Sequence, residues 1–174
     1  LTACLAESLP LAQALYSQIE PDQPENTLAA KLLLERACLL AVAAPDQATP
    51  LPENVHQQAE SLFTELANRE NASRTLWLVR CQALWEYARG DYPAAQQLWY
   101  QIRQGINRDQ DELSHYYWWE ARYFGLCCLW HQGQGEEVLH ILEVDEKTNP
   151  GSPSLWKPRL LDLQNQIRST PPAN

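Results

Sequence analysis

Tryptophan and arginine, three residues apart, recur along the chain, and together they have the chemistry of a binding surface. A guanidinium group holds a carboxylate through two parallel hydrogen bonds, and an indole ring supplies a large, rigid contact area. Residues three apart lie on one face of a helix, so each pair could reach one ligand. The pairs are Trp77 with Arg80, Trp119 with Arg122 and Trp156 with Arg159, and a weaker copy has Leu33 before Arg36. The pattern predicts a surface that binds a protein or peptide partner, acidic partners included.

The same repeat has a second interpretation, in which these residues serve packing. Each tryptophan would lie between neighbouring helices, and each arginine would pair with an acidic residue of the next helix. Glu35, Glu86 and Glu120 are close enough in sequence to accept such pairs. A repeated architecture repeats its packing residues as well as its binding residues. The sequence therefore leaves both interpretations open.

Catalysis finds little support in the residue pattern. The chain has 4 His, and none stands with a nucleophile and an orienting acid in a recognisable arrangement. No glycine-rich phosphate loop occurs. Cys127 and Cys128 precede His131 at a spacing that could ligate a metal, but no second pair with ligand spacing accompanies them. We therefore expect no enzymatic activity, no catalytic residue, no metal and no cofactor.

Acidic residues occur in two short runs. Asn107, Asp109 and Asp111 resemble the start of a calcium loop, but Trp118 stands where such a loop needs a bidentate glutamate. We expect these acids to cap the following helix, whose dipole favours negative charge at its start. The second run lies near the end of a predicted helix and comprises Glu143, Asp145 and Glu146. We expect this run to be a solvated acidic helix end.

Composition excludes several classes of partner. The chain of 174 residues carries a net charge of −9, which argues against nucleic acid, since nucleic-acid binding requires a basic surface. No apolar run reaches the length of a membrane span. The length suits one domain or one array of small units.

The cysteines bear on the compartment. Their number, 5, is odd and two are adjacent, so they do not form a disulfide framework. Buried free thiols in a reducing cytoplasm are the favoured interpretation. Residues 1–4, LTAC, resemble a bacterial lipobox that ends at Cys4, which would instead place the chain in the cell envelope or periplasm. The compartment stays open between these two.

Helical periodicity fills nearly the whole chain, and Pro, Gly, Asn and Asp punctuate it. Pro10 and Pro93 fall in first turns, and Asp91 and Ser154 suit N-cap positions. We predict about eight helices and a frayed C-terminal tail. The predicted helices span residues 8–20, 27–44, 53–69, 74–89, 91–104, 111–132, 135–146 and 154–168, and the tail spans 169–174.

Two types of helix alternate along the chain. The first carries the Trp-x-x-Arg pattern. The second carries a small residue followed by apolar residues three, four and seven positions on, which makes one buried stripe. This stripe recurs within residues 9–19, 56–66, 92–102 and 135–145. Such pairs cannot bury their apolar faces alone, so neighbouring pairs must stack.

The segment GDYPAAQQLW, residues 90–99, resembles the turn and second helix of the tetratricopeptide repeat family, through its Gly, Asp, Tyr, Ala and aromatic positions. Ala83 or Gly125 falls near the position where that family packs two helices closely. The resemblance covers about residues 8–168. Repeats spaced about 42 residues apart, where the family has 34, leave a related helical-pair solenoid open as well.

The resemblance implies a fold that is all-α, a right-handed α-solenoid of antiparallel helix pairs that forms a single domain over residues 1–174. The first and last helices would lack partners. That implies a fragment of a longer, bacterial-type array, or a homodimer through the uncovered terminal helices. The pairs would span residues 27–69, 74–104 and 111–146, between the unpaired helices 8–20 and 154–168.

In that family the first helices of the pairs line a concave surface that binds peptides, and on that frame Trp77, Arg80 and Tyr87 would line the groove. The resemblance thus implies a ladder of Arg36, Arg80, Arg122 and Arg159, with Trp77, Trp119 and Trp156 beside it. We expect a non-catalytic protein-interaction scaffold. The alternative is a structural, spacer or self-assembly module of a larger protein, with no groove ligand.

Overall fold

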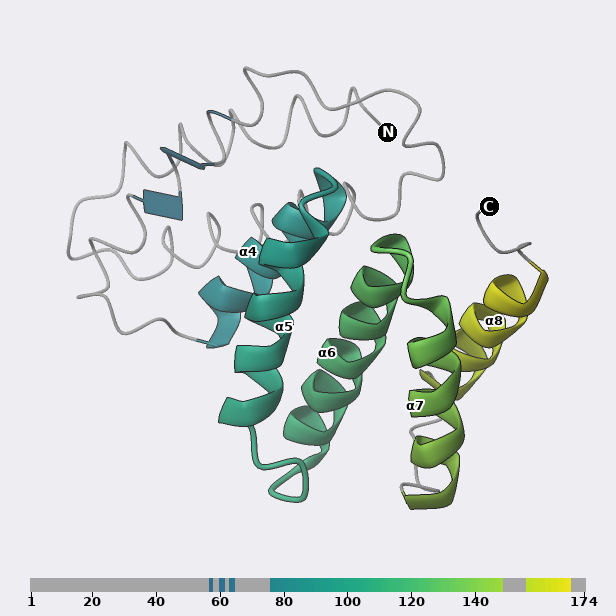
Figure 1. Cartoon of the computed structure of the whole chain (residues 1–174). Coiled ribbons are helices and arrows are strands. Elements are labelled where there is room, and N and C mark those ends of the chain that lie inside the picture. The colour runs from purple at the N-terminus through teal and green to yellow at the C-terminus, as the bar shows by residue number, and fades with distance from the viewer. Residues whose placement is uncertain (1–56, 58–59, 62, 65–75, 149–155, 170–174) are drawn as a thin grey trace. The chain divides into compact units, whose positions relative to one another are not determined.

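The computed structural model describes residues 57, 60, 61, 63, 64, 76–148 and 156–169 (Figure 1). This part of the chain is helical and contains no strand, which confirms the all-α prediction for the described residues. Its helices with defined bounds are α4 (Leu76–Ala88), α5 (Tyr92–Gly105), α6 (Glu112–His131), α7 (Gly135–Thr148) and α8 (Trp156–Ser169).

These five helices begin and end within two residues of their predicted bounds. α8 includes Ser169, which the sequence assigned to the frayed tail. The predicted helices 8–20 and 27–44, the candidate Arg36 and the lipobox-like residues 1–4 lie outside the described residues.

Turn chemistry sets the start of α5 and the end of α6. The Asp91 carboxylate accepts a hydrogen bond from the backbone N–H of Ala94 at 3.1 Å, as the predicted N-cap should. α6 ends at His131, two residues before Gly133, whose φ of 82° favours glycine because a glycine has no Cβ. The N–H of Gly133 donates to Trp130 O at 2.9 Å, and the N–H of Gln134 donates to Leu129 O at 3.0 Å. These two bonds form a Schellman motif, which satisfies the last carbonyls of the helix.

The chain divides into two compact units, residues Leu1–Gly90 and Asp91–Asn174. α4 belongs to the first unit and carries buried side chains on most of its circumference, among them Leu78, Leu84 and Trp85. The second unit contains α5 to α8. There α6 packs against α5, α7 and α8, and α7 also packs against α8.

The core of the second unit is built from aromatic rings. Ala95, Trp99 and Ile102 form the buried stripe of α5 that the sequence predicted. The Trp99 ring stacks on Phe124 of α6, with ring centroids 5.1 Å apart. α8 joins the same unit through Trp156, which is fully buried.

α7 departs from the stripe at one position. Val138 and Leu142 are buried as predicted, but the third member of the stripe is Asp145, where α5 has Ile102. The expectation of a solvated acidic end is therefore wrong for Asp145, whereas Glu143 and Glu146 are exposed. A carboxylate stays ionised in such a place only when a cation compensates its desolvation.

Within the part of the chain that the structure describes, no helix combines the length and apolarity that crossing a membrane requires.

The cap of α5 is open to a direct test. We expect Asp91→Ala to lower the free energy of unfolding by about 1 kcal/mol, because the Ala94 N–H loses its acceptor, whereas Asp91→Asn keeps most of the stability. Urea unfolding of the full chain measures both variants. Equal losses for the alanine and asparagine variants would contradict the capping role.

Candidate functional site

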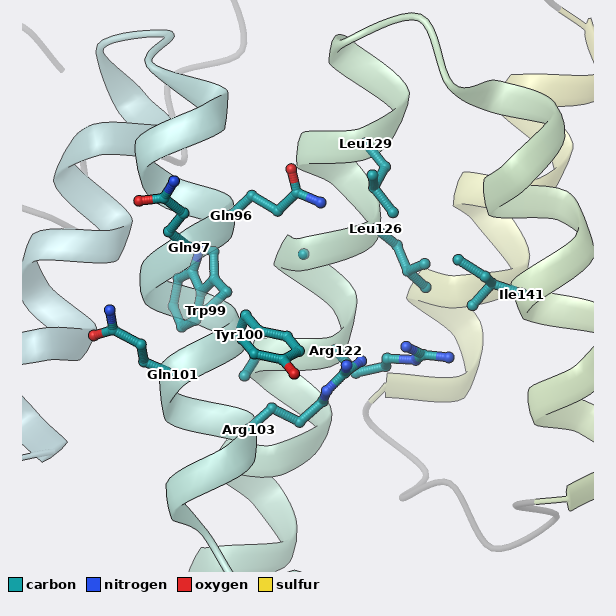
Figure 2. Close-up of a pocket in the computed structure, with 12 residues that line it drawn as sticks. Gln96, Gln97, Trp99, Tyr100, Gln101, Arg103, Arg122, Leu126, Leu129 and Ile141 are labelled. Carbon is teal, nitrogen blue, oxygen red and sulfur yellow. The ribbon is translucent and has the colours of Figure 1, made fainter.

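A groove of about 570 Å³ lies across α5, α6 and α7 of the second unit (Figure 2). That volume falls within the range of ligand pockets. The apolar part of its lining includes Trp99, Tyr100, Leu126, Leu129 and Ile141, and the polar part includes Gln96, Gln97, Gln101, Arg103 and Arg122. An apolar lining with a few polar groups is the usual composition of a binding site.

The groove is open over Gly125, which lies in the middle of α6. A Cβ added at Gly125 would have no heavy atom within 4 Å. The expectation that a neighbouring helix packs closely at this residue is therefore wrong. Close approach occurs instead at Gly135, where an added Cβ would lie 3.2 Å from Ile167 Cγ2. The glycine of α6 thus deepens the groove rather than admitting a helix.

One end of the groove is charged. The Arg122 guanidinium donates two hydrogen bonds to the Asp145 carboxylate, from Nε to Oδ2 at 2.7 Å and from a terminal nitrogen to Oδ1 at 2.9 Å. Their side chains are only 16% and 10% exposed. Such bidentate geometry is the strongest form of this ion pair. It ties α7 to α6 and supplies the cation that Asp145 requires.

A second arginine lies at the same end. In Figure 2, Arg103 and Arg122 lie close together beside Tyr100. The Arg103 Cζ is 5.6 Å from the centre of the Tyr100 ring, a cation–π distance. Burial and, next, the charge of Arg122 lower the pKa of Arg103, although a guanidinium remains protonated at neutral pH.

The opposite end of the groove is held by polar and aromatic contacts between α5 and the end of α6. Gln132 donates a hydrogen bond from Nε2 to Gln96 Oε1 at 2.9 Å. Tyr92 stacks on His131 with ring centroids 4.3 Å apart and planes 8° from parallel. Burial lowers the pKa of His131, which favours the neutral imidazole in this stack.

The sequence-predicted binding residues of the second unit occupy different environments. Trp119 and Trp156 have exposed fractions of 2% and 1%, so both rings lie in the core. Arg122 lines the groove and is paired with Asp145. Arg159 is exposed, with its Cζ 4.9 Å from the centre of the Trp156 ring. Of these four residues, only Arg122 lines the groove.

The predicted residues on α4 belong to the first unit. Arg80 is buried, with an exposed fraction of 5%, whereas Trp77 and Tyr87 are half-buried. Arg36 lies outside the described residues.

The structure also shows the environment of the cysteine pattern that could ligate a metal. Cys127 and Cys128 are buried and take part in no disulfide bond. Burial raises the pKa of Cys128 to about 12, which disfavours the thiolate that a metal needs. Among the described residues, no group of three His, Cys, Asp or Glu side chains is arranged to hold a metal.

Of the run before α6, Asp111 caps the helix, as predicted. The Asp111 carboxylate accepts a hydrogen bond from the Ser114 N–H at 2.6 Å, which lowers the pKa of Asp111. Asn107 stabilises the preceding turn, since its side-chain oxygen accepts a hydrogen bond from the Asp109 N–H at 3.3 Å.

Sequence reasoning missed several groove residues. Arg103, Tyr100 and Gln96 were not singled out, because their helix was read only for its buried stripe. A signal was present: Gln96, Tyr100 and Arg103 stand at intervals of four and three residues, which is a second face of the same helix.

Comparison with protein-family models, with curated proteins and with solved structures finds no match to this chain.

The ion pair between α6 and α7 yields a stability prediction. We expect Asp145→Asn to lower the free energy of unfolding by about 2–3 kcal/mol, because Arg122 would remain largely buried beside Arg103 without an anion. Glu143→Gln, on the exposed face of the same helix, should change it by no more than about 0.5 kcal/mol. Urea unfolding measures both, and equal effects would show that the pair does not hold α7.

The open space over Gly125 leads to a second stability prediction. We expect Gly125→Ala to raise the free energy of unfolding by about 0.5–1 kcal/mol, since alanine favours the helix and its methyl group meets no neighbour. Gly135→Ala is the matched comparison and should gain less, because its methyl group crowds Ile167. Thermal unfolding compares the stabilities of the two variants. A Gly125→Ala variant that is less stable than the Gly135→Ala variant would contradict the open groove.

Proposed function

We propose that this chain is a non-catalytic protein-interaction module that binds an extended segment of a partner protein in the groove across α5, α6 and α7. The observation that carries the proposal is the open floor at Gly125, flanked by apolar side chains. A flexible or wholly packed surface would not offer such a preformed space, and a preformed site avoids part of the ordering cost of binding.

The polar lining suits a peptide in particular. Gln96, Gln97 and Gln101 lie along α5 at the groove. An amide side chain can donate to a peptide carbonyl and accept from a peptide N–H, so a row of amides can pair with an extended backbone. Tyr100, which is 56% exposed, adds a rigid aromatic contact surface of the kind that dominates binding energies.

We also propose that the helices form a right-handed solenoid of the tetratricopeptide-like kind. In such a stack each helix packs on the next, and the first helix of one pair packs on the first helix of the following pair. The packing of α6 against both α7 and α8, and of α7 against α8, supports this arrangement. The solenoid would present one groove per pair, and the described groove would be one of that series.

The second candidate is a structural or spacer module with no groove ligand. The burial of Trp119 and Trp156 and the internal neutralisation of Arg122 by Asp145 favour it, since a spacer needs these residues only for packing. A self-assembly role would use exposed apolar side chains such as Leu161 of α8, which is 55% exposed.

A blocked groove separates the two candidates. We expect the full chain to select peptides from a displayed library of random dodecapeptides. The Gly125→Leu variant should bind the selected peptides about tenfold or more weakly, because the leucine side chain fills the floor of the groove. Gly105→Leu is the matched control, because Gly105 is exposed, lies outside the groove and also has no atom within 4 Å of an added Cβ.

Fluorescence anisotropy gives the dissociation constants. No selected peptide at all, or peptides that bind the Gly125→Leu and Gly105→Leu variants equally well, would contradict groove binding and favour the spacer.

A further inference from the structure

The two arginines at the charged end of the groove differ in what holds them. Arg122 donates two hydrogen bonds to the Asp145 carboxylate. Arg103 contacts the face of the Tyr100 ring, and Asp145 acts on it through charge rather than through such hydrogen bonds. Arg103 is therefore the cation at this end whose donors are available to a ligand.

Local charge differs in sign from the charge of the whole chain. Arg103 and Arg122 carry two positive charges against the single negative charge of Asp145, so this end of the groove is left with one positive charge. The whole chain has a net charge of −9. A positive site half-shielded from water attracts an anionic group more strongly than an exposed arginine would, because the effective dielectric constant is lower there.

The positive end and the apolar floor lie on neighbouring turns of α6. Arg122, which neighbours Arg103, and Gly125 are three residues apart on α6, so they share a face within about one helical turn, or ~5 Å. In an extended peptide, side chains two residues apart point to the same side and are separated by about 6.6 Å. A peptide that lies along α6 could therefore place one side chain over Gly125 and another, two residues away, at the charged end beside Arg122.

We propose that the groove recognises an extended peptide in which an acidic and an apolar residue stand two positions apart, with the carboxylate bound by Arg103 and the apolar side chain seated over Gly125. This inference rests on the proposed function, since it names the ligand chemistry of the same groove. Arg122 and Asp145 act as positioning residues: their pair fixes Arg122 and leaves Arg103 to the ligand.

A peptide series tests the spacing. N-acetylated, C-terminally amidated octapeptides of Ser and Gly carry one Leu and one Glu at separations of one, two, three or four residues. Titrated into the ¹⁵N-labelled full chain, the peptide with separation two should shift the Gly125 amide signal and bind at least about tenfold more tightly than separations one and three. A second arm with a free C-terminus in place of the Glu side chain shows which carboxylate the site prefers.

A double-mutant cycle tests the contact. We expect Arg103→Gln and replacement of the peptide Glu by Gln each to weaken binding about 10- to 100-fold, and the two changes together to weaken it no further than one alone. Arg168→Gln, which removes an exposed arginine of α8 outside the groove, is the matched control and should leave the dissociation constant unchanged.

The outcomes separate this inference from the proposed function. Peptides that lose binding in Gly125→Leu but not in Arg103→Gln, or that bind without any carboxylate, would overturn the inference and leave groove binding standing. Absence of binding throughout this series and the displayed library would overturn both. Additive effects in the cycle would show that the carboxylate contacts another residue, which also overturns the assignment to Arg103.

Discussion

The ion pair between Arg122 and Asp145 is the constraint on which the site depends. It places a charge in the buried stripe of α7, at the position where α5 has an isoleucine. Replacing a hydrophobic residue in this way costs desolvation, and only a correctly placed guanidinium compensates it. The pair therefore admits one register of α7 on α6, because a shift of one residue would leave both charges unpaired in the core.

This register shapes the groove. With Arg122 held at the charged end of the groove, α6 presents Gly125 about one turn further along. α5 contributes Arg103 and Tyr100 beside Arg122 (Figure 2). Glycine in the middle of a helix costs about 0.5–1 kcal/mol relative to alanine. Close packing does not require it here, since no atom lies near an added Cβ. The proposed binding floor would give Gly125 a use that packing does not.

Much of the fold could be predicted from sequence, because its signals are local. Asp91 before Tyr92 marks the start of α5, and Gly133 marks the end of α6. The spacing of Ala95, Trp99 and Ile102 identifies the buried face of α5. Each of these depends on residues within one or two turns, where capping and helical periodicity are decisive.

The site could be predicted only in part, because it depends on pairs from different helices. The packing interpretation, in which an arginine pairs with an acidic residue of the next helix, holds for Arg122. Its periodicity, however, does not reveal that Asp145, 23 residues away, accepts the hydrogen bond. The same periodicity cannot tell a glycine that admits a helix from one that leaves a space. Arg103 has no arginine at the matching position of the other stripe-bearing segments, so no repeat marks it.

The side-chain NH signals of Arg122 test this account most directly. In the ¹⁵N-labelled full chain at neutral pH, we expect the Arg122 Hε to exchange with water far more slowly than the Hε of exposed Arg159, because Asp145 accepts its hydrogen bond. Asp145→Asn should abolish that protection. Equal exchange rates at Arg122 and Arg159 would show that the ion pair does not persist. That result would contradict both the single register of α7 on α6 and the groove that depends on this register.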